Sequence, residues 1–243
     1  MFKICLNTDI TLFVGDPSCT EAYQWLHDIL ADTTNAWLSV DSDFNDRVKG
    51  NLGEFVAFHV TKHGFNFAGY YFFASNTDSP LSRISGAGLD LAYLFLGADP
   101  TGIDDVLIIQ EVKTTGSSTL TYAKRLIADH QKLGSVDPSL NLQARVRALK
   151  ARLRDIHNIS DRAILDRVQA LAHPDPAKCH KVTLRPTLVY ERIGCDPLTT
   201  LRDVKEEIEK LGWHGSKILP VGIALSKVNS GFASLAMNKV FIP

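Results

Sequence analysis

The sequence predicts an α/β fold in which helices flank a mixed β-sheet. Hydrophobic residues make up 45% of the 243 residues, which is the usual share for a globular protein with a substantial core. Segments with apolar residues every three or four positions, typical of helices, alternate with short apolar segments typical of strands. In the middle of the chain three such strands follow one another closely, so antiparallel neighbours are expected in the sheet.

Residues 1–45 are predicted to form an N-terminal extension made of a hairpin and a helix. Two β-like segments, at about 2–6 and 11–14, are separated by a short polar turn. A second turn at Asp16 then leads into a helix at about 20–30.

The remaining residues, 46–243, are assigned to one domain that begins with a helix, three strands and a second helix. The first helix carries Val48, Leu52 and Val60 at helical spacing, and Gly64 is a suitable terminator. The helices are expected at about 46–63 and 122–133, and the strands at about 67–74, 89–96 and 106–113.

The second half of this domain contains a helical insertion at about 139–176. Its apolar residues are spaced by three or four positions, and the polar segment 158–161 is expected to divide it into two helices. After it, we expect strands at about 185–191 and 219–226 on either side of a helix at about 201–211.

Charged residues occupy two predicted strands whose neighbours are apolar. Asp90 lies between two leucines, and Glu111 and Lys113 end an apolar strand two residues apart, so that both point to one face. Burying an ionised group without a partner is costly, and carboxylates that share a cation avoid that cost. Mg²⁺ usually takes one or two carboxylates together with waters and phosphate oxygens. The pattern therefore indicates a Mg²⁺ (or Mn²⁺) site for phosphodiester hydrolysis, with Lys113 orienting the attacking water.

Asp90 and the sequence Glu111-Val112-Lys113, on two strands joined by a turn, resemble the motif of the PD-(D/E)xK nuclease superfamily. The resemblance implies a restriction-endonuclease-like core with a helix, three strands, a helix and a further strand. It also implies a glutamate from the first core helix, and Glu54 stands at that place. The glycines of the segment 85–88 fit the family, whereas its usual proline before the aspartate is missing.

Within that superfamily, the layout is similar to the HamA-type nuclease subunit of Hachiman antiphage defence, which acts with a helicase. The resemblance thus implies DNA as substrate, a protein partner such as a helicase, and Asp90, Glu111 and Glu54 as metal ligands beside Lys113. A Glu-x-Lys pair on an exposed strand would be an ordinary ion pair, and a helical glutamate usually faces water. We expect Gln110 to have a structural role on the opposite face and His130 to be a surface residue.

Charge is distributed unevenly along the chain. The net charge is −1, but residues 124–185 contain thirteen Lys and Arg against six Asp and Glu. A basic helix is most often a solvated face, but beside a nuclease-like site it favours contacts with a phosphate backbone or an acidic partner. No aromatic residue lies between Leu126 and Tyr190, so base stacking by this segment is not expected. The candidate nucleic-acid-binding residues are Arg145, Arg147, Lys150, Arg152 and Arg154.

Several classes of function are not expected. The sequence has no Gly-x-x-x-x-Gly-Lys-[Ser/Thr] motif, so no nucleotide cofactor is predicted. It shows no secretory signal and no apolar run long enough for a membrane. The four cysteines lack zinc spacing and are interpreted as reduced thiols of a cytoplasmic protein.

Two other functions remain open. The chain could be a catalytically inactive nuclease-fold subunit that recruits a helicase or nucleic acid, or a metal-dependent hydrolase of a different substrate. The residues also leave open DNA or RNA, single or double strands, and endonuclease or exonuclease activity.

Overall fold

The computed structural model describes residues 2–7, 9–32, 44–74, 89–117, 121–192 and 196–237, together with 239 and 242. Within these ranges the chain forms seven α-helices and two mixed β-sheets, which confirms the predicted α/β class. The strands form two sheets, where the sequence predicted one. The glycine-containing segment 85–88, predicted to lead into Asp90, lies outside the described residues.

The first sheet has five strands in the order β1-β2-β9-β8-β6. β1 and β2 form the predicted antiparallel hairpin, and the other neighbours in this sheet are parallel. Because β2 pairs with β9, the hairpin predicted as an extension is the edge of this sheet. The strands are β1 (Phe2–Asn7), β2 (Ile10–Gly15), β9 (Val221–Leu225), β8 (Thr187–Glu191) and β6 (Val112–Thr115).

The second sheet has four strands in the order β3-β4-β5-β7. Its first three strands are antiparallel neighbours, as their sequence order predicts, whereas β7 runs parallel to β5. The strands are β3 (Tyr70–Ala74), β4 (Leu91–Phe95), β5 (Val106–Gln110) and β7 (Val182–Leu184).

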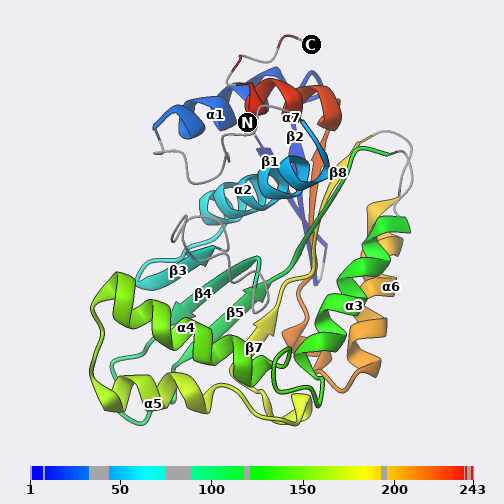
Figure 1. Ribbon diagram of the computed structural model, residues 1–243. Coiled ribbons are helices and arrows are strands. Elements are labelled where there is room, and N and C mark those ends of the chain that lie inside the picture. Colours follow the sequence, from blue (N-terminus) through cyan, green and yellow to red (C-terminus); the bar gives the residue numbers. More distant parts are fainter. Residues whose placement is uncertain are drawn as a thin grey trace.

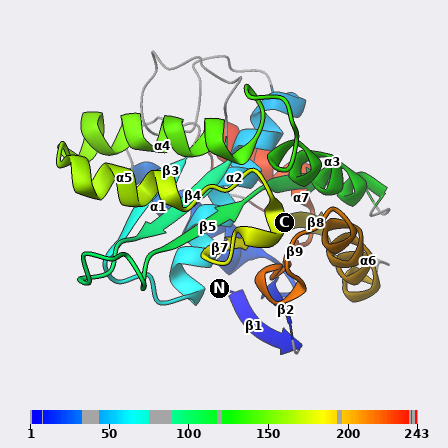
Figure 2. The ribbon, with the colours of Figure 1, turned by 90° about the horizontal axis from the view of Figure 1, so that it is seen from below.

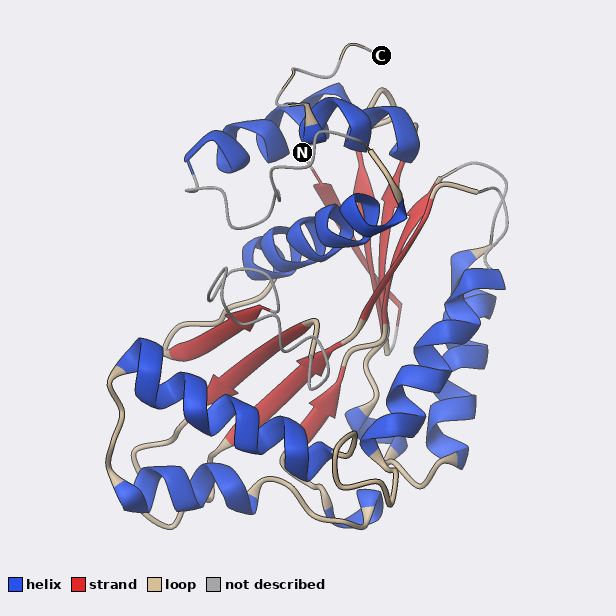
Figure 3. Cartoon of the chain, viewed as in Figure 1, coloured by secondary structure: helices blue, strands red, loops and turns tan. Residues whose placement is uncertain are grey.

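Two stretches of chain pass from one sheet into the other, side by side (Figure 3). β5 continues into β6 with only Glu111 between them, and β7 continues into β8 through Arg185 and Pro186. The amide of Arg185 donates to the carbonyl of Ile109 at 2.7 Å, and the amide of Thr187 donates to the carbonyl of Glu111 at 2.8 Å. We call this place, residues 110–112 and 185–187, the sheet junction.

The helices cover both faces of the sheets (Figures 1 and 2). One apolar cluster joins α1, α2 and α7 to one face, and the other joins α3 and α6 to the opposite face of the first sheet and α4 and α5 to the second. None of the helices in the described ranges has the length and apolar character needed to cross a membrane. The helices are α1 (Thr20–Asp32), α2 (Asp46–Gly64), α3 (Lys124–Leu133), α4 (Leu142–His157), α5 (Arg162–Ala170), α6 (Pro197–Lys210) and α7 (Val228–Ala236), with 3₁₀ turns η1 (Thr121–Ala123), η2 (Pro176–Lys178) and η3 (Gly215–Lys217).

The predicted helical insertion is confirmed as two helices, α4 and α5. Asn158 ends α4 in the left-handed conformation, with φ of 55°, and the Asp161 side chain caps α5 by accepting from the amide of Ala163. The apolar sides of both helices, which include Leu149 and Leu165, belong to the core cluster over the second sheet. The insertion is therefore a layer of the fold that covers a sheet face.

Candidate active site

Asp90 and Glu111 meet at the sheet junction. Asp90 lies just before β4, beyond the last β4–β5 pair of Leu91 with Gln110, and its Oδ2 accepts from the amide of Val112 at 2.7 Å. The Asp90 carboxyl group therefore accepts a hydrogen bond from the Val112 amide at the break between β5 and β6. Glu111 is 3% exposed, and its carboxyl is near enough to Asp90 for each of the two acids to affect the pKa of the other. The predicted convergence of these two acids is present in the structure.

Burial makes this carboxyl pair hard to ionise. Burial raises the pKa of Asp90, and it raises the pKa of Glu111 still further because the charge of Asp90 adds to it. The nearby cations Arg145 and Lys113 oppose the rise in the pKa of Glu111. The Oε1 atom of Glu111 is buried, and none of the described residues forms a hydrogen bond with it. The protein by itself thus favours a proton between the two carboxyls, at a place where a divalent cation could replace that proton.

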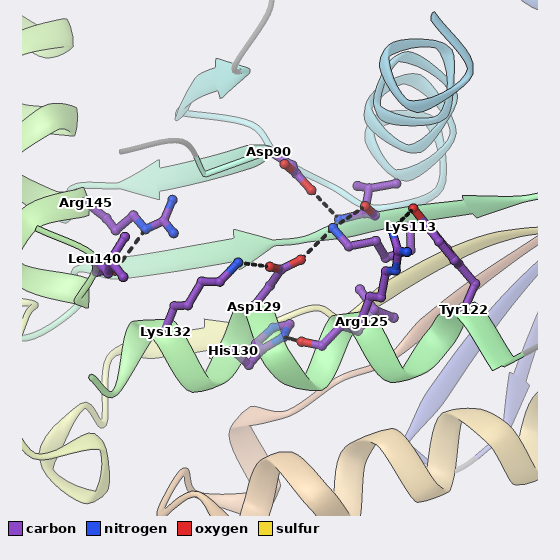
Figure 4. A network of polar contacts seen from close by, with 11 residues as sticks. Asp90, Lys113, Tyr122, Arg125, Asp129, His130, Lys132, Leu140 and Arg145 are labelled. Atoms are coloured by element: carbon purple, nitrogen blue, oxygen red, sulfur yellow. Dashed lines mark hydrogen bonds and ion pairs between the residues drawn. The ribbon is translucent and has the colours of Figure 1, made fainter. Parts of the chain in front are cut away.

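Lys113 is held near Asp90 by the carboxylate of Asp129 from α3, as the close view shows (Figure 4). Its Nζ lies 2.6 Å from Oδ2 of Asp129 and donates to the carbonyl of Val112 at 3.2 Å. Burial alone would lower the pKa of Lys113, but the charges of Asp90 and Asp129 outweigh burial and raise it. Lys113 is therefore a fixed cation, and its role as a general base is not favoured.

Asp129 is a site residue that the sequence analysis missed. It also pairs with Lys132 at 2.7 Å, and the two lysines hold its pKa below the usual value against the effect of burial. The helical periodicity of α3 is the sequence feature that could have placed Asp129 on the side facing the cleft. Asp129 and Lys132 share the polar side of this helix, whereas Leu126 and Leu133 lie on its buried side.

The expectation that His130 is a surface residue was wrong. Its side chain is fully buried, its Nδ1 lies 2.7 Å from the carbonyl of Leu126, and burial lowers its pKa to about 4. Since Leu126 and Leu133 are also buried, His130 belongs to the apolar side of α3. Lys132, by contrast, is exposed on the side of α3 that carries Asp129.

Glu54 faces the site from α2. The helix starts at an Asn45 cap and packs so closely on β6 that a Cβ at Gly53 would lie 1.7 Å from Oγ1 of Thr114. Only glycine permits this approach, and the next residue, Glu54, then lines the same cleft as Asp90. Gly53 and Glu54 therefore have separate roles, in packing and in the site.

The cleft over these residues has a volume of about 750 Å³. Within the described ranges, no group of three or more His, Cys, Asp or Glu is placed to hold a metal ion. Asp90 and Glu111 form a pair, whereas Glu54 lines the cleft without completing such a group with them. A pair is sufficient for Mg²⁺, which commonly takes one or two carboxylates and fills its remaining positions with water and substrate oxygens.

The basic residues of α4 do not share one surface. Arg145 is buried, with its Nε donating to the carbonyl of Leu140 at 3.3 Å, and its charge reaches Glu111. Seven residues along, Arg152 lies on the same side of the helix and is half-buried. The other three, on a different side and partly or fully exposed, are Arg147, Lys150 and Arg154.

The structural role expected for Gln110 is confirmed. Its Oε1 accepts from the hydroxyl of Tyr93 at 2.7 Å, and its Nε2 donates to Thr187 at 3.0 Å. The hydroxyl of Thr61 lies 3.0 Å from that of Tyr93 and extends this network to α2. The network ties α2 to the sheet junction from the side opposite the carboxyl pair.

Neither protein-family models nor curated protein sequences match this chain. The assignment of a function therefore rests on the geometry and chemistry of the site.

Proposed function

We propose that the protein is a metal-dependent nuclease that hydrolyses phosphodiester bonds. One observation supports this most directly: Asp90 and the buried Glu111 lie together at the sheet junction, and Oε1 of Glu111 has no hydrogen-bond partner among the described residues. A buried polar atom without a partner is costly. A bound cation would remove that cost and the repulsion between the two carboxylates.

The residues fit Mg²⁺ or Mn²⁺. Asp90 and Glu111 would hold the ion, and Glu54 would contribute from the facing helix. The bound ion would lower the pKa of a water ligand and neutralise charge on the phosphodiester.

Two further residues prepare the site for a phosphate. Lys113 supplies a charged donor at the base of the cleft, where it can hold a phosphate oxygen or the attacking water. Asp129 is a positioning residue, because its ion pair keeps the Lys113 ammonium beside the carboxyl pair. Substrate binding would require Lys113 to share its donors between Asp129 and the substrate.

The wider setting follows from the resemblance to PD-(D/E)xK nucleases. We propose DNA as the substrate and a helicase-like protein as the partner, in a cytoplasmic complex of antiphage defence. The basic residues Arg147 and Arg154, which are exposed, and Lys150, which is partly exposed, would be available to that partner or to DNA outside the cleft.

The activity can be tested with purified full-length protein and end-labelled DNA, with Mg²⁺ or Mn²⁺ added. We expect cleavage by the wild type, and a loss of at least about a hundredfold in Lys113→Ala and in Asp90→Asn. Lys124→Ala is a matched control, because Lys124 is an exposed lysine on the same helix as Asp129 and does not line the cleft. Equal cleavage by the wild type and Lys113→Ala would overturn the assignment.

One observation favours the second candidate, a catalytically inactive binding subunit. Lys113 is already paired with Asp129, and no three-ligand group is formed within the described ranges. Metal binding distinguishes the two functions, since an ion that binds the folded protein raises its melting temperature. If Mg²⁺ and Mn²⁺ leave the wild-type melting temperature unchanged and no DNA is cleaved, the binding subunit is favoured.

A further inference from the structure

Two helices face each other across the cleft. α2 contributes Lys49 and Glu54 to one wall, and α3 contributes Arg125 and Lys132 to the other, with Tyr122 from the 3₁₀ turn that precedes it. Arg125 and Lys132 are seven residues apart and therefore lie along one side of α3, whereas Lys49 and Glu54 reach the cleft from neighbouring sides of α2. Each wall thus carries cations together with acids, which are Asp46 and Glu54 on α2 and Asp129 on α3, and the Lys113 ammonium lies at the base.

The dimensions of the cleft decide which form of nucleic acid can enter. A volume of about 750 Å³ falls within the range of sites that hold one small ligand, so it admits on the order of two nucleotides. The side chain of Lys113 is only 18% exposed, and Asp90 is half-buried. Among the described residues, the cleft that leads to them is lined by α2 and α3, and a strand within a duplex would have to bring its complement into it.

Tyr122 adds a surface on which a base can stack. The guanidinium of Arg125 lies 4.3 Å from the centre of the Tyr122 ring, and its Nη1 donates to the Tyr122 hydroxyl at 2.8 Å. An aromatic ring combined with cations along a groove is typical of proteins that bind single strands. α4 has no aromatic residue and so lacks this combination.

We propose that the cleft between α2 and α3 binds a single strand of nucleic acid. Lys49, Arg125 and Lys132 contact phosphates on either side of the bond to be cleaved, and Tyr122 stacks on a neighbouring base. This proposal rests on the nuclease function and specifies its substrate as a single strand or an unpaired end.

Binding can be measured by fluorescence anisotropy on the full-length protein, in EDTA to prevent cleavage. The probes are a labelled oligothymidine and a labelled hairpin duplex of the same number of nucleotides. We expect tighter binding of oligothymidine, with an affinity that falls as salt rises. Lys49→Gln and Arg125→Gln should each reduce the slope of log affinity against log salt by about 0.7. Tyr122→Leu should weaken binding roughly five- to a hundredfold.

Each cleft variant has a matched control on the same helix. Arg47→Gln on α2 and Lys124→Gln on α3 remove an exposed cation outside the cleft and should leave the salt slope unchanged. Arg147→Gln removes an exposed cation on the outer side of α4 and should likewise leave the salt slope unchanged. Equal losses in cleft and control variants, duplex binding as tight as oligothymidine binding, or no binding at all would each overturn the proposal.

The two proposals can fail separately. Oligothymidine binding that depends on Arg125, without any metal-dependent cleavage, would refute the nuclease and keep the binding site. Duplex cleavage that depends on Lys113 but is unaffected by Arg125→Gln would refute the single-strand cleft and keep the nuclease.

Discussion

Glu111 and Arg185 occupy equivalent places on two neighbouring stretches of chain, and they differ in what surrounds them. Both are almost completely buried, at 3% and 7% exposure, and both interrupt an apolar strand at the sheet junction. Glu111 meets Asp90 and the cations of the cleft. The guanidinium of Arg185 lies 4.1 Å from the centre of the Phe65 ring and 5.3 Å from that of Phe67.

This difference shows that burial alone does not mark a catalytic residue. In the part of the chain that the structure describes, the Nε and Nη1 atoms of Arg185 have no hydrogen-bond partner, and neither has Oε1 of Glu111. Arg185 is nevertheless stacked on aromatic rings, and a desolvated cation gains about 2 kcal/mol or more from such a contact. Glu111 is stabilised by no such contact and adjoins a second carboxyl beside an open cleft. We therefore assign chemistry to Glu111 and packing to Arg185.

Glu111→Gln should have the largest effect on activity. The amide is a poor metal ligand, so we expect DNA cleavage to fall by at least about a hundredfold. The metal-free protein should keep or gain stability at neutral pH. The pKa of Glu111 is raised in the fold, so in the wild type stability is lost as the pH rises from the unfolded pKa towards the folded one.

Cleavage assays and urea unfolding at pH 4.5 and pH 8 measure both effects of Glu111→Gln. The wild type should lose more stability between these pH values than the variant does. A variant that cleaves normally, or that is destabilised most at pH 8, would contradict the role given to Glu111.

Arg185→Ala should show the opposite pattern. Removing the guanidinium leaves a cavity beside Phe65 and Phe67, and we expect a loss of about 2–4 kcal/mol in the free energy of unfolding. The cleavage rate per folded molecule should not change. Arg185→Met is the control: it preserves most of the volume and removes two unpartnered polar atoms, so its cost should stay within about 1.5 kcal/mol. Loss of cleavage in a stable, folded Arg185→Met would place this residue in the site.

The order of elements could largely be predicted from the sequence. The hairpin, the break between α4 and α5, and the series from α2 to α3 follow from apolar spacing and turn residues. α7 could not be predicted, because its Gly231 lowers the helix propensity. A Cβ at Gly231 would lie 2.0 Å from the ring of Tyr23, so tertiary packing determines this residue.

The site was predictable only in part. Asp90, Glu111 and Lys113 stood out because charge in an apolar strand is unusual, and the same rule could have revealed Arg185. It could not have separated their roles, since the aromatic contacts of Arg185 come from a distant part of the chain. Asp129 lies on a polar helix side, where acids are ordinarily solvated, and only the fold brings it to Lys113.

The position of the Glu111 stretch at the sheet junction also depends on how closely α2 packs against β6. Substitutions at two glycines of α2 test this dependence. Gly53→Ala would place its Cβ against Thr114, so we expect a loss of about 1–3 kcal/mol in the free energy of unfolding, with weaker cleavage. Among the described residues, a Cβ at Gly50 would meet no atom within 4 Å beyond its chain neighbours and the adjacent backbone of α2, so Gly50→Ala should stabilise the helix by about 0.5–1 kcal/mol. Thermal unfolding of both variants measures the difference. Similar changes in both would mean that the α2–β6 contact adjusts freely.

His59 extends the comparison to a half-buried base. It lies on α2 with its ring centre 4.6 Å from that of Phe55, and burial lowers its pKa to about 4. Its neutral form is favoured in the fold, so stability is complete above the unfolded pKa of 6.5 and is lost as the pH falls towards 4. This dependence is opposite in sign to that of Glu111.

His59→Phe replaces the imidazole with a ring that does not titrate. Between pH 8 and pH 5, the wild type should lose on the order of 1–2 kcal/mol more of its unfolding free energy than the variant does. His130 has a similarly low pKa and remains in both proteins, so part of the acid sensitivity should persist in His59→Phe. Urea unfolding at the two pH values measures the difference. If the two proteins have the same pH dependence, His59 accepts a proton in the fold as readily as in the unfolded chain, and α2 is more open to water than its aromatic contacts indicate.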